Sequence, residues 1–188
     1  MPALASFLDP KTFHITAWGL AIGSNFFNSF IGGPVAFKAL PRPQFATLQT
    51  KLVPVYFALE CVYPVVLALT LPGEKLASAG GNVLSRDAGF AGLLAEEHRW
   101  TALVPIASAF VTSVLNALVW GPWTTKVMKE RKHQETREGK KYYDQGPKST
   151  EMQRLNKSFM WLHSASALTN LLGLGALAWY GATLAEKL

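Results

Sequence analysis

Four long apolar segments constrain this chain more than any other feature of its sequence. They cover about residues 13–37, 51–71, 100–120 and 159–184. Each approaches the roughly 20 apolar residues that an α-helix needs to cross a hydrocarbon core. A chain of 188 residues with only 16% charged residues has too little polar surface to bury four such helices in a soluble core. The sequence therefore predicts an all-α integral membrane protein, a four-helix bundle that forms one domain over residues 1–188.

The connections between these segments carry different signals. The first, residues 38–50, contains Pro41-Arg42-Pro43, which interrupts a helix and predicts a short rigid turn at the headgroup level. The second, residues 72–99, contains an apolar stretch over 88–95 that fits either a short interfacial helix or a mobile loop. The third, residues 121–158, lacks Gly and Pro between Trp123 and Glu138, so we expect the third helix to continue into water. Ser149 or Thr150 is expected to cap the fourth helix.

Positive charge is distributed unevenly between the two sides of the predicted membrane domain. Four spans place the termini and the second loop on one side, with five of the 18 Lys and Arg residues: Lys11, Lys75, Arg86, Arg99 and Lys187. The other thirteen lie in the first and third loops: Lys38, Arg42, Lys51, Lys126, Lys129, Arg131, Lys132, Arg137, Lys140, Lys141, Lys148, Arg154 and Lys157. Because positively charged loops remain in the cytoplasm, we expect a basic helical cytoplasmic hairpin between spans three and four. Both termini are then expected to face the lumen or the exterior.

The net charge of +6 indicates which partners to expect. The charge lies beside apolar segments, so anionic lipid headgroups are its expected counter-charge, and nucleic acid is not expected as a partner. Other membrane proteins, or a second copy of the chain, are the protein partners that such a molecule would bind. An endomembrane or plasma membrane location is expected, with a mitochondrial membrane as the alternative.

Polar residues inside the apolar segments are the main candidates for a functional site, because such groups are costly in hydrocarbon. Glu60 falls near the middle of the second span, where it could bind a proton or cation or could simply be a neutral, hydrogen-bonded side chain. Asn25 and Asn28, with Ser24 and Ser29, fall on one face of the first span. This polar stripe fits either packing between helices or part of a conduit.

A second set of polar residues is expected near the cytoplasmic ends of the spans. His163, Ser166 and Asn170 share one face of the fourth span, and Asn116 lies at a similar depth in the third. Together with Arg42, Gln49 and neighbouring Gln44 they would form either a structural hydrogen-bond network or a pocket for a lipid headgroup or small ligand. We therefore take Arg42, Gln49, Asn116, His163, Ser166 and Asn170 as lipid- or ligand-binding candidates.

Signals for catalysis or a bound cofactor are missing from the sequence. It contains no HExxH or Gly-x-Ser-x-Gly motif, no CxxC pair and no glycine-rich phosphate loop. His14 and His163 fall near opposite ends of their spans, so they cannot share a haem iron. The sequence therefore predicts a protein that is not an enzyme, with no catalytic residues, metal site or cofactor.

Three blocks of residues resemble the transmembrane protein 205-like family. The first block is Leu40-Pro41-Arg42, Phe45, Gln49, Lys51-Leu52, Pro54 and Tyr56-Phe57. The second and third blocks are Asn116-Ala117, Pro122 and Thr124-Thr125, and then Phe159, His163, Ser166 and Asn170-Leu171. The resemblance implies a small multi-pass membrane protein without an established enzymatic activity, from a family linked to drug resistance and vesicle traffic. The family tends to have an acid and an arginine flanking the proline at the end of the third span, where this chain has Gly121 and Trp123.

These observations leave two classes of function. The first is a membrane scaffold or accessory subunit that binds partner proteins and anionic lipid through its helix faces and basic hairpin. The alternative is a small transporter or channel component that uses Glu60 and the Asn25/Asn28 stripe.

Overall fold

The protein is built almost entirely from long helices that lie side by side. Its structure, a computed structural model, describes residues 9–73, 75–78, 81–84 and 88–186. Arg86 and Lys187 lie outside the described residues. Both belong to the five basic residues predicted on the same side of the membrane as the termini.

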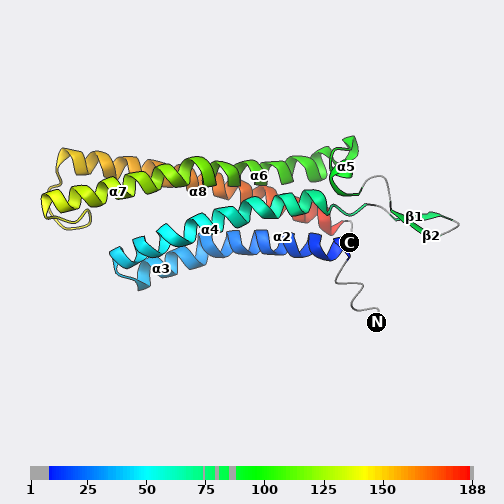
Figure 1. The fold of residues 1–188 in the computed structure, drawn as a ribbon, viewed down its shortest axis with the longest axis horizontal. Helices are drawn as coiled ribbons and strands as arrows, with labels where there is room; N and C mark the ends of the chain where they lie inside the picture. Colours follow the sequence, from blue (N-terminus) through cyan, green and yellow to red (C-terminus); the bar gives the residue numbers. More distant parts are fainter. Residues whose placement is uncertain (1–8, 74, 79–80, 85–87, 187–188) are drawn as a thin grey trace.

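Four helical segments run along the long axis of the molecule (Figure 1). The first is continuous through α2 (Pro10–Phe26), η1 (Phe27–Gly32) and α3 (Gly33–Ala39). It is followed by α4 (Arg42–Leu69). The third is continuous through η2 (Glu96–His98), η3 (Arg99–Leu103), α6 (Val104–Leu115), η4 (Asn116–Trp120) and α7 (Gly121–Glu138). The last is α8 (Thr150–Ala185).

The connection between α4 and the third segment holds the remaining elements. Strands β1 (Lys75–Ser78) and β2 (Gly81–Leu84) pair antiparallel, with Lys75 opposite Leu84. A short helix, α5 (Gly89–Leu93), follows them inside the apolar stretch where an interfacial helix was one of two expectations. In Figure 1 this connection lies at the end of the molecule where α2 begins and α8 ends.

The turn between the first two helical segments is shorter than the sequence suggested. Only Leu40 and Pro41 separate α3 from α4, because α4 begins at Arg42 with a proline in its first turn. A first-turn N–H has no partner within the helix, so a proline there costs little. The expectation that Pro41-Arg42-Pro43 interrupts the helix is correct at Pro41, but the turn does not extend to Thr50.

Three segments of these helices adopt the wider π-helical hydrogen-bonding pattern, and each precedes a proline. Pro34, Pro105 and Pro122 are the second residues of α3, α6 and α7, which follow η1, η3 and η4 respectively. Proline cannot donate a hydrogen bond to the carbonyl four residues earlier, and its ring clashes with that carbonyl. That carbonyl lies inside the preceding π segment in all three cases, so local widening accommodates each proline without ending the helix.

Three helical stretches are long and apolar enough to cross a membrane: Arg42–Leu69, Glu96–Glu138 and Thr150–Ala185. They correspond to the second, third and fourth predicted spans, although α4 ends at Leu69, two residues before the predicted end of the second span. The α2–α3 segment is not among them, since two asparagines and two serines lower its mean hydropathy. The protein is therefore a helical chain with three candidate membrane spans.

The outward faces of these helices are strongly apolar. Leu118 is 71% exposed, Leu168 is 60% exposed, and Phe26, Phe27 and Phe30 are each about half exposed. Soluble monomers rarely expose apolar surface on this scale. These faces are suited to contact with lipid acyl chains.

Packing between the helices closes into a ring in which α2 contacts α4 and α8, and α6 contacts the same two helices. The buried core contains several small side chains, among them Ala17, Ala21 and Ala109. Small residues let neighbouring helices approach closely, which is how helices associate where lipid surrounds them. Beyond this ring α7 packs on the first half of α8, and the pair extends past α3 (Figure 1).

Candidate functional site

A buried polar network lies between α2, α4 and α8, centred on Glu60. The Glu60 side chain is only 2% exposed. Its Oε1 lies 2.7 Å from the Ser24 hydroxyl, and its Oε2 accepts a hydrogen bond of 3.3 Å from Asn25 Nδ2. Both partners come from the first helical segment and both are uncharged. Among the described residues, no Lys, Arg or His is bonded to this carboxyl group.

The single hydrogen atom of the Ser24 hydroxyl helps to define the protonation state of Glu60. The Ser24 hydroxyl also lies 2.6 Å from the carbonyl oxygen of Leu20, one turn earlier in its own helix. One hydroxyl has one hydrogen, so it can donate to only one of these oxygens. If it donates to Leu20, a protonated Glu60 supplies the hydrogen for the other contact. The geometry therefore accommodates a neutral carboxylic acid, which avoids the cost of a buried, unpaired charge.

Asn170 connects α8 to the network. Its Oδ1 accepts hydrogen bonds from the Tyr56 hydroxyl (2.9 Å) and from Asn25 Nδ2 (3.3 Å). Its Nδ2 donates to Asn25 Oδ1 (3.1 Å) and to the Ser29 hydroxyl (2.8 Å). This one side chain thus connects α8 to both α4 and the first segment, where Tyr56 lies one turn before Glu60.

The structure groups the candidate residues differently from the two clusters that the sequence suggested. Asn170 was expected in the cytoplasmic-side set, the six lipid- or ligand-binding candidates predicted from the sequence, but it lies in the Glu60 network. Asn28 was expected to share a polar stripe with Asn25. Its side chain is half-buried and makes no hydrogen bond to the described residues of the network. The π-helical pattern begins at Phe27, so the regular α-helical spacing on which that expectation depended does not hold there.

The remaining members of the cytoplasmic-side set do not converge on one pocket. Ser166 donates a 2.7 Å hydrogen bond to Oδ1 of Asn116, which is fully buried and whose Nδ2 has no partner among the described residues. His163 is exposed and stacks on Phe159.

Two further members of that set lie in the first half of α4. The Arg42 guanidinium lies 3.5 Å from the centre of the Phe37 ring and donates a 3.4 Å hydrogen bond to the Phe37 carbonyl oxygen. Gln49 is half-buried. Of the six residues in this set, Asn116 and Ser166 are the two that the structure joins by a hydrogen bond.

The basic hairpin of α7 and the first half of α8 is held together by a buried arginine. Arg131 is 7% exposed, and its guanidinium lies 3.9 Å from the centre of the Tyr142 ring and 4.5 Å from that of Phe159. These cation–π contacts connect α7, the loop and α8. Burial lowers the pKa of Arg131 from its usual value.

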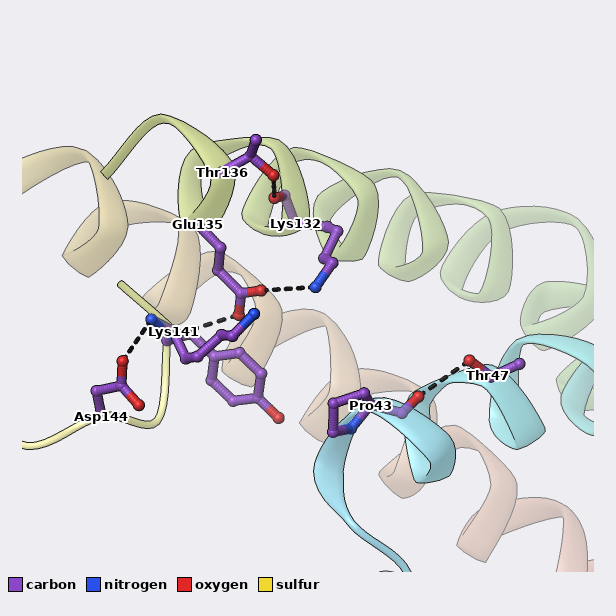
Figure 2. A network of polar contacts seen from close by, with 8 residues as sticks. Pro43, Thr47, Lys132, Glu135, Thr136, Lys141 and Asp144 are labelled. Carbon is purple, nitrogen blue, oxygen red and sulfur yellow. Dashed lines mark hydrogen bonds and ion pairs between the residues drawn. The ribbon is translucent and has the colours of Figure 1, made fainter. Parts of the chain in front are cut away.

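Glu135 provides a second fixed point in the hairpin. It accepts a 3.2 Å hydrogen bond from Lys132 Nζ and a 3.1 Å bond from the backbone N–H of Tyr142. Figure 2 shows Glu135 pointing toward Lys132, with the loop that carries Lys141 and Asp144 folded back against α7. The Lys141 N–H donates to the Asp144 carboxylate at 2.7 Å. The hairpin is therefore an ordered structure with defined side-chain contacts.

The end of α7 and the start of α8 are joined by a capping interaction. Ser149 is the N-cap residue of α8, where its hydroxyl accepts a hydrogen bond from Met152 N–H at 3.0 Å. The same hydroxyl donates to the Glu138 carboxylate, which also accepts from Gln134 Nε2 at 2.6 Å. These hydrogen bonds, from Ser149 first and Gln134 second, lower the pKa of Glu138.

Two polar contacts were missed by the sequence analysis. Tyr56 was noted only for its place in a family signature, although its position one turn before Glu60 could have indicated a shared helix face. His14 was considered only as a haem ligand, but it lies 2.5 Å from the Tyr180 hydroxyl and 3.1 Å from the Thr70 hydroxyl. This contact joins α2, α4 and α8 near the end of the molecule opposite the hairpin.

The chemistry available in the core is that of a carboxyl group surrounded by amides and hydroxyls. Within the described ranges no group of three or more His, Cys, Asp or Glu side chains is placed to hold a metal ion. The Glu60 network offers oxygen atoms that could hold a proton or a small cation.

The fold and these sites define a helical protein with three candidate membrane spans and a polar network buried between its helices. Residues 16–133 match the family described as a domain of unknown function, DUF4149, and the chain belongs to this family. The chain is also similar to "Xanthocillin biosynthesis cluster protein D" of Aspergillus fumigatus, with 27% identity over 176 residues that cover 94% of this chain and 89% of that protein. No solved structure matches the chain.

Proposed function

We propose that this protein is a non-enzymatic integral membrane protein with four spans, a four-helix bundle whose first span is the α2–α3 segment. Polar residues lower the hydropathy of this segment, but their side chains point toward the other helices, and this supports the proposal. Ser24, Asn25 and Ser29 bond to one another or to Glu60 and Asn170, while phenylalanines cover the outer side. A helix with this arrangement can span a bilayer, because its polar groups find partners inside the protein.

In this proposal the protein is a scaffold or accessory subunit that binds anionic lipid and other membrane proteins. The observation that carries it is the ordered basic hairpin, which presents exposed Lys and Arg side chains on a rigid support beyond the apolar spans. Each Lys or Arg near an anionic surface contributes about 1 kcal/mol to membrane binding at low salt. The positive-inside bias supports a cytoplasmic location for this hairpin, or a matrix location if the membrane is mitochondrial.

Lipid binding is tested on the full-length protein in detergent supplied with equal amounts of phosphatidylserine and phosphatidylcholine. We expect phosphatidylserine to be retained preferentially at low salt and released as salt is raised, because screening weakens exposed charge interactions. Equal retention of the two lipids at low salt would contradict the lipid-binding part of the proposal. Partner binding is tested by cross-linking in native membranes, where recovery of the monomer alone would contradict a scaffold role.

The relatives are compatible with an accessory role. The name of the Aspergillus fumigatus relative assigns that protein to a xanthocillin biosynthesis cluster and states no reaction. The resemblance to the transmembrane protein 205-like family would place this chain among multi-pass proteins linked to drug resistance and vesicle traffic. An endomembrane or plasma membrane location agrees with such roles, with a mitochondrial membrane as the alternative.

The buried carboxyl group supports a second candidate, a small transporter or channel component. Glu60 is 2% exposed and bonded only to uncharged groups, so it could take up and release a proton or a small cation. Four helices enclose little space, so such a protein would act as an oligomer.

Flux into liposomes that contain purified protein separates this candidate from the first. Glu60→Gln keeps the size of the side chain and one acceptor oxygen but cannot carry a charge. If Glu60 carries protons or cations, flux is lost in this variant and kept in Glu97→Gln, where the substituted side chain is exposed. Flux equal to that of empty liposomes in the unmodified protein would eliminate the transporter.

A further inference from the structure

A groove of about 730 Å³ lies between α7 and α8, at the base of the basic hairpin. Lys126 lines one wall of it from α7, and Lys157 and Arg154 line the other from α8. Glu130 is the acidic residue that lines it. Three cations against one anion leave the groove positively charged.

The two lysines are available to a ligand. Lys126 and Lys157 are exposed, and neither bonds to another side chain among the described residues. Arg154, in contrast, is held by a two-point ion pair with Glu151, through bonds of 2.9 and 2.6 Å. With Arg154 paired to Glu151, two lysines, one from each wall, and the Glu130 carboxylate leave a net charge of +1 in the groove. A phosphate group between the two lysines suits this arrangement.

Tryptophans form the apolar end of the same groove. Trp123 and Trp161 line it and are 54% and 61% exposed. Trp120 braces both rings through edge-to-face contacts, with ring centroids 6.1 Å from Trp123 and 5.7 Å from Trp161. Tryptophan gathers where the hydrocarbon core meets the headgroups. The lysines of the groove therefore lie at headgroup level, next to outward faces that carry exposed residues such as Leu118 and Met160.

We propose that this groove is a binding site for one anionic phospholipid, with the phosphate between Lys126 and Lys157 and the acyl chains along the tryptophans and the apolar faces of α6 and α8. This inference depends on the proposed membrane orientation and on the proposed lipid binding of the hairpin. It adds to them the position of the lipid and its chemical class. A free phosphate ion would use the lysines alone. A phospholipid uses the charged and the aromatic parts together.

The test compares two double variants of the full-length protein by native mass spectrometry, with phosphatidylserine and phosphatidylcholine of identical acyl chains. Lys126→Gln with Lys157→Gln removes both free charges of the groove. Lys38→Gln with Lys51→Gln removes the same charge from exposed positions in α3 and α4, at the same end of the spans. Lys126 and Lys157 line the groove and would contact the lipid directly, whereas Lys38 and Lys51 do not line it. At about fivefold for each contacting lysine, the groove variant should lose about 25-fold in phosphatidylserine preference. The control variant should lose much less, and Lys126→Arg with Lys157→Arg should keep the preference.

Each other outcome overturns the site in an identifiable way. If the two double variants lose preference equally, the hairpin attracts lipid by diffuse charge and the groove is not a site, while the proposed lipid binding stands. If the unmodified protein shows no preference, both proposals fail together. If inorganic phosphate displaces the lipid at comparable concentration, the ligand is a phosphate ion and the phospholipid assignment is wrong.

Discussion

Replacing Asn170 by Leu should destabilise the packed helices far more than a polar-to-apolar change in a membrane helix usually does. Leucine has the same branched arrangement of side-chain heavy atoms as asparagine, although its methyl groups take up more space, so the change removes the hydrogen bonds without leaving a cavity. The side chain accepts bonds from Tyr56 and Asn25, and donates to Asn25 and Ser29. The substitution removes all four bonds, including the one that the Tyr56 hydroxyl donates.

The expected magnitude follows from the number of these bonds. Hydrogen bonds between membrane helices average about 0.6 kcal/mol, so four of them predict a loss of about 2–3 kcal/mol. His163→Leu, on the same helix, is the matched control. His163 is exposed, and substitutions at such positions usually stay within about 0.5 kcal/mol.

Equilibrium unfolding of the purified protein in mixed micelles, followed by circular dichroism at increasing SDS, measures both variants on one scale. We expect Asn170→Leu to unfold at a clearly lower SDS concentration than the unmodified protein. His163→Leu should unfold at the same SDS concentration as the unmodified protein. If the two variants unfold together, the network does not stabilise the fold, and the energetic argument from its geometry is refuted.

Two further predictions concern orientation and packing. In intact membranes, an impermeant thiol reagent applied from outside should label a cysteine placed at Ala185 but not one placed at Gly139, and the reverse pattern would invert the proposed topology. Gly181→Ala should destabilise by about 1–3 kcal/mol, because the added Cβ would overlap the Trp18 ring. In the same unfolding assay Gly175→Ala should be neutral or stabilising by up to about 1 kcal/mol, since no atom lies within 4 Å of its Cβ position and alanine favours helix. Equal stability of these two variants would contradict the close contact at Gly181.

The candidate sites could be predicted in part from the sequence. Glu60 and Asn25 were singled out because polar groups inside an apolar helix need partners, and the structure places them in one network. Asn170 was singled out for the same reason but assigned to the wrong neighbours. Its partners depend on how far α8 is shifted along α2 and α4, and periodicity within one helix carries no information about that shift.

The groove between α7 and α8 was not predicted, although its charged residues had been counted. The sequence showed ten basic residues in the third loop, but it did not show which of them were free. Arg131 is buried against Tyr142 and Phe159, and Arg154 is paired with Glu151, while Lys126 and Lys157 remain unpaired. The packing of the hairpin buries Arg131, whereas Arg154 is paired within its own helix with Glu151, three residues earlier.

The sequence by itself determined that this chain forms long apolar helices with an appended basic hairpin. These properties depend on composition and local propensity: apolar length, the absence of Gly and Pro from Trp123 to Glu138, and a capping serine before α8. Tertiary structure decided which polar groups meet and which charges face outward. The ring of α2, α4, α6 and α8 brings Asn170 to Asn25, although 145 residues separate them in the chain. These features arise from contacts between residues far apart in the chain, and such contacts exist only after the helices pack.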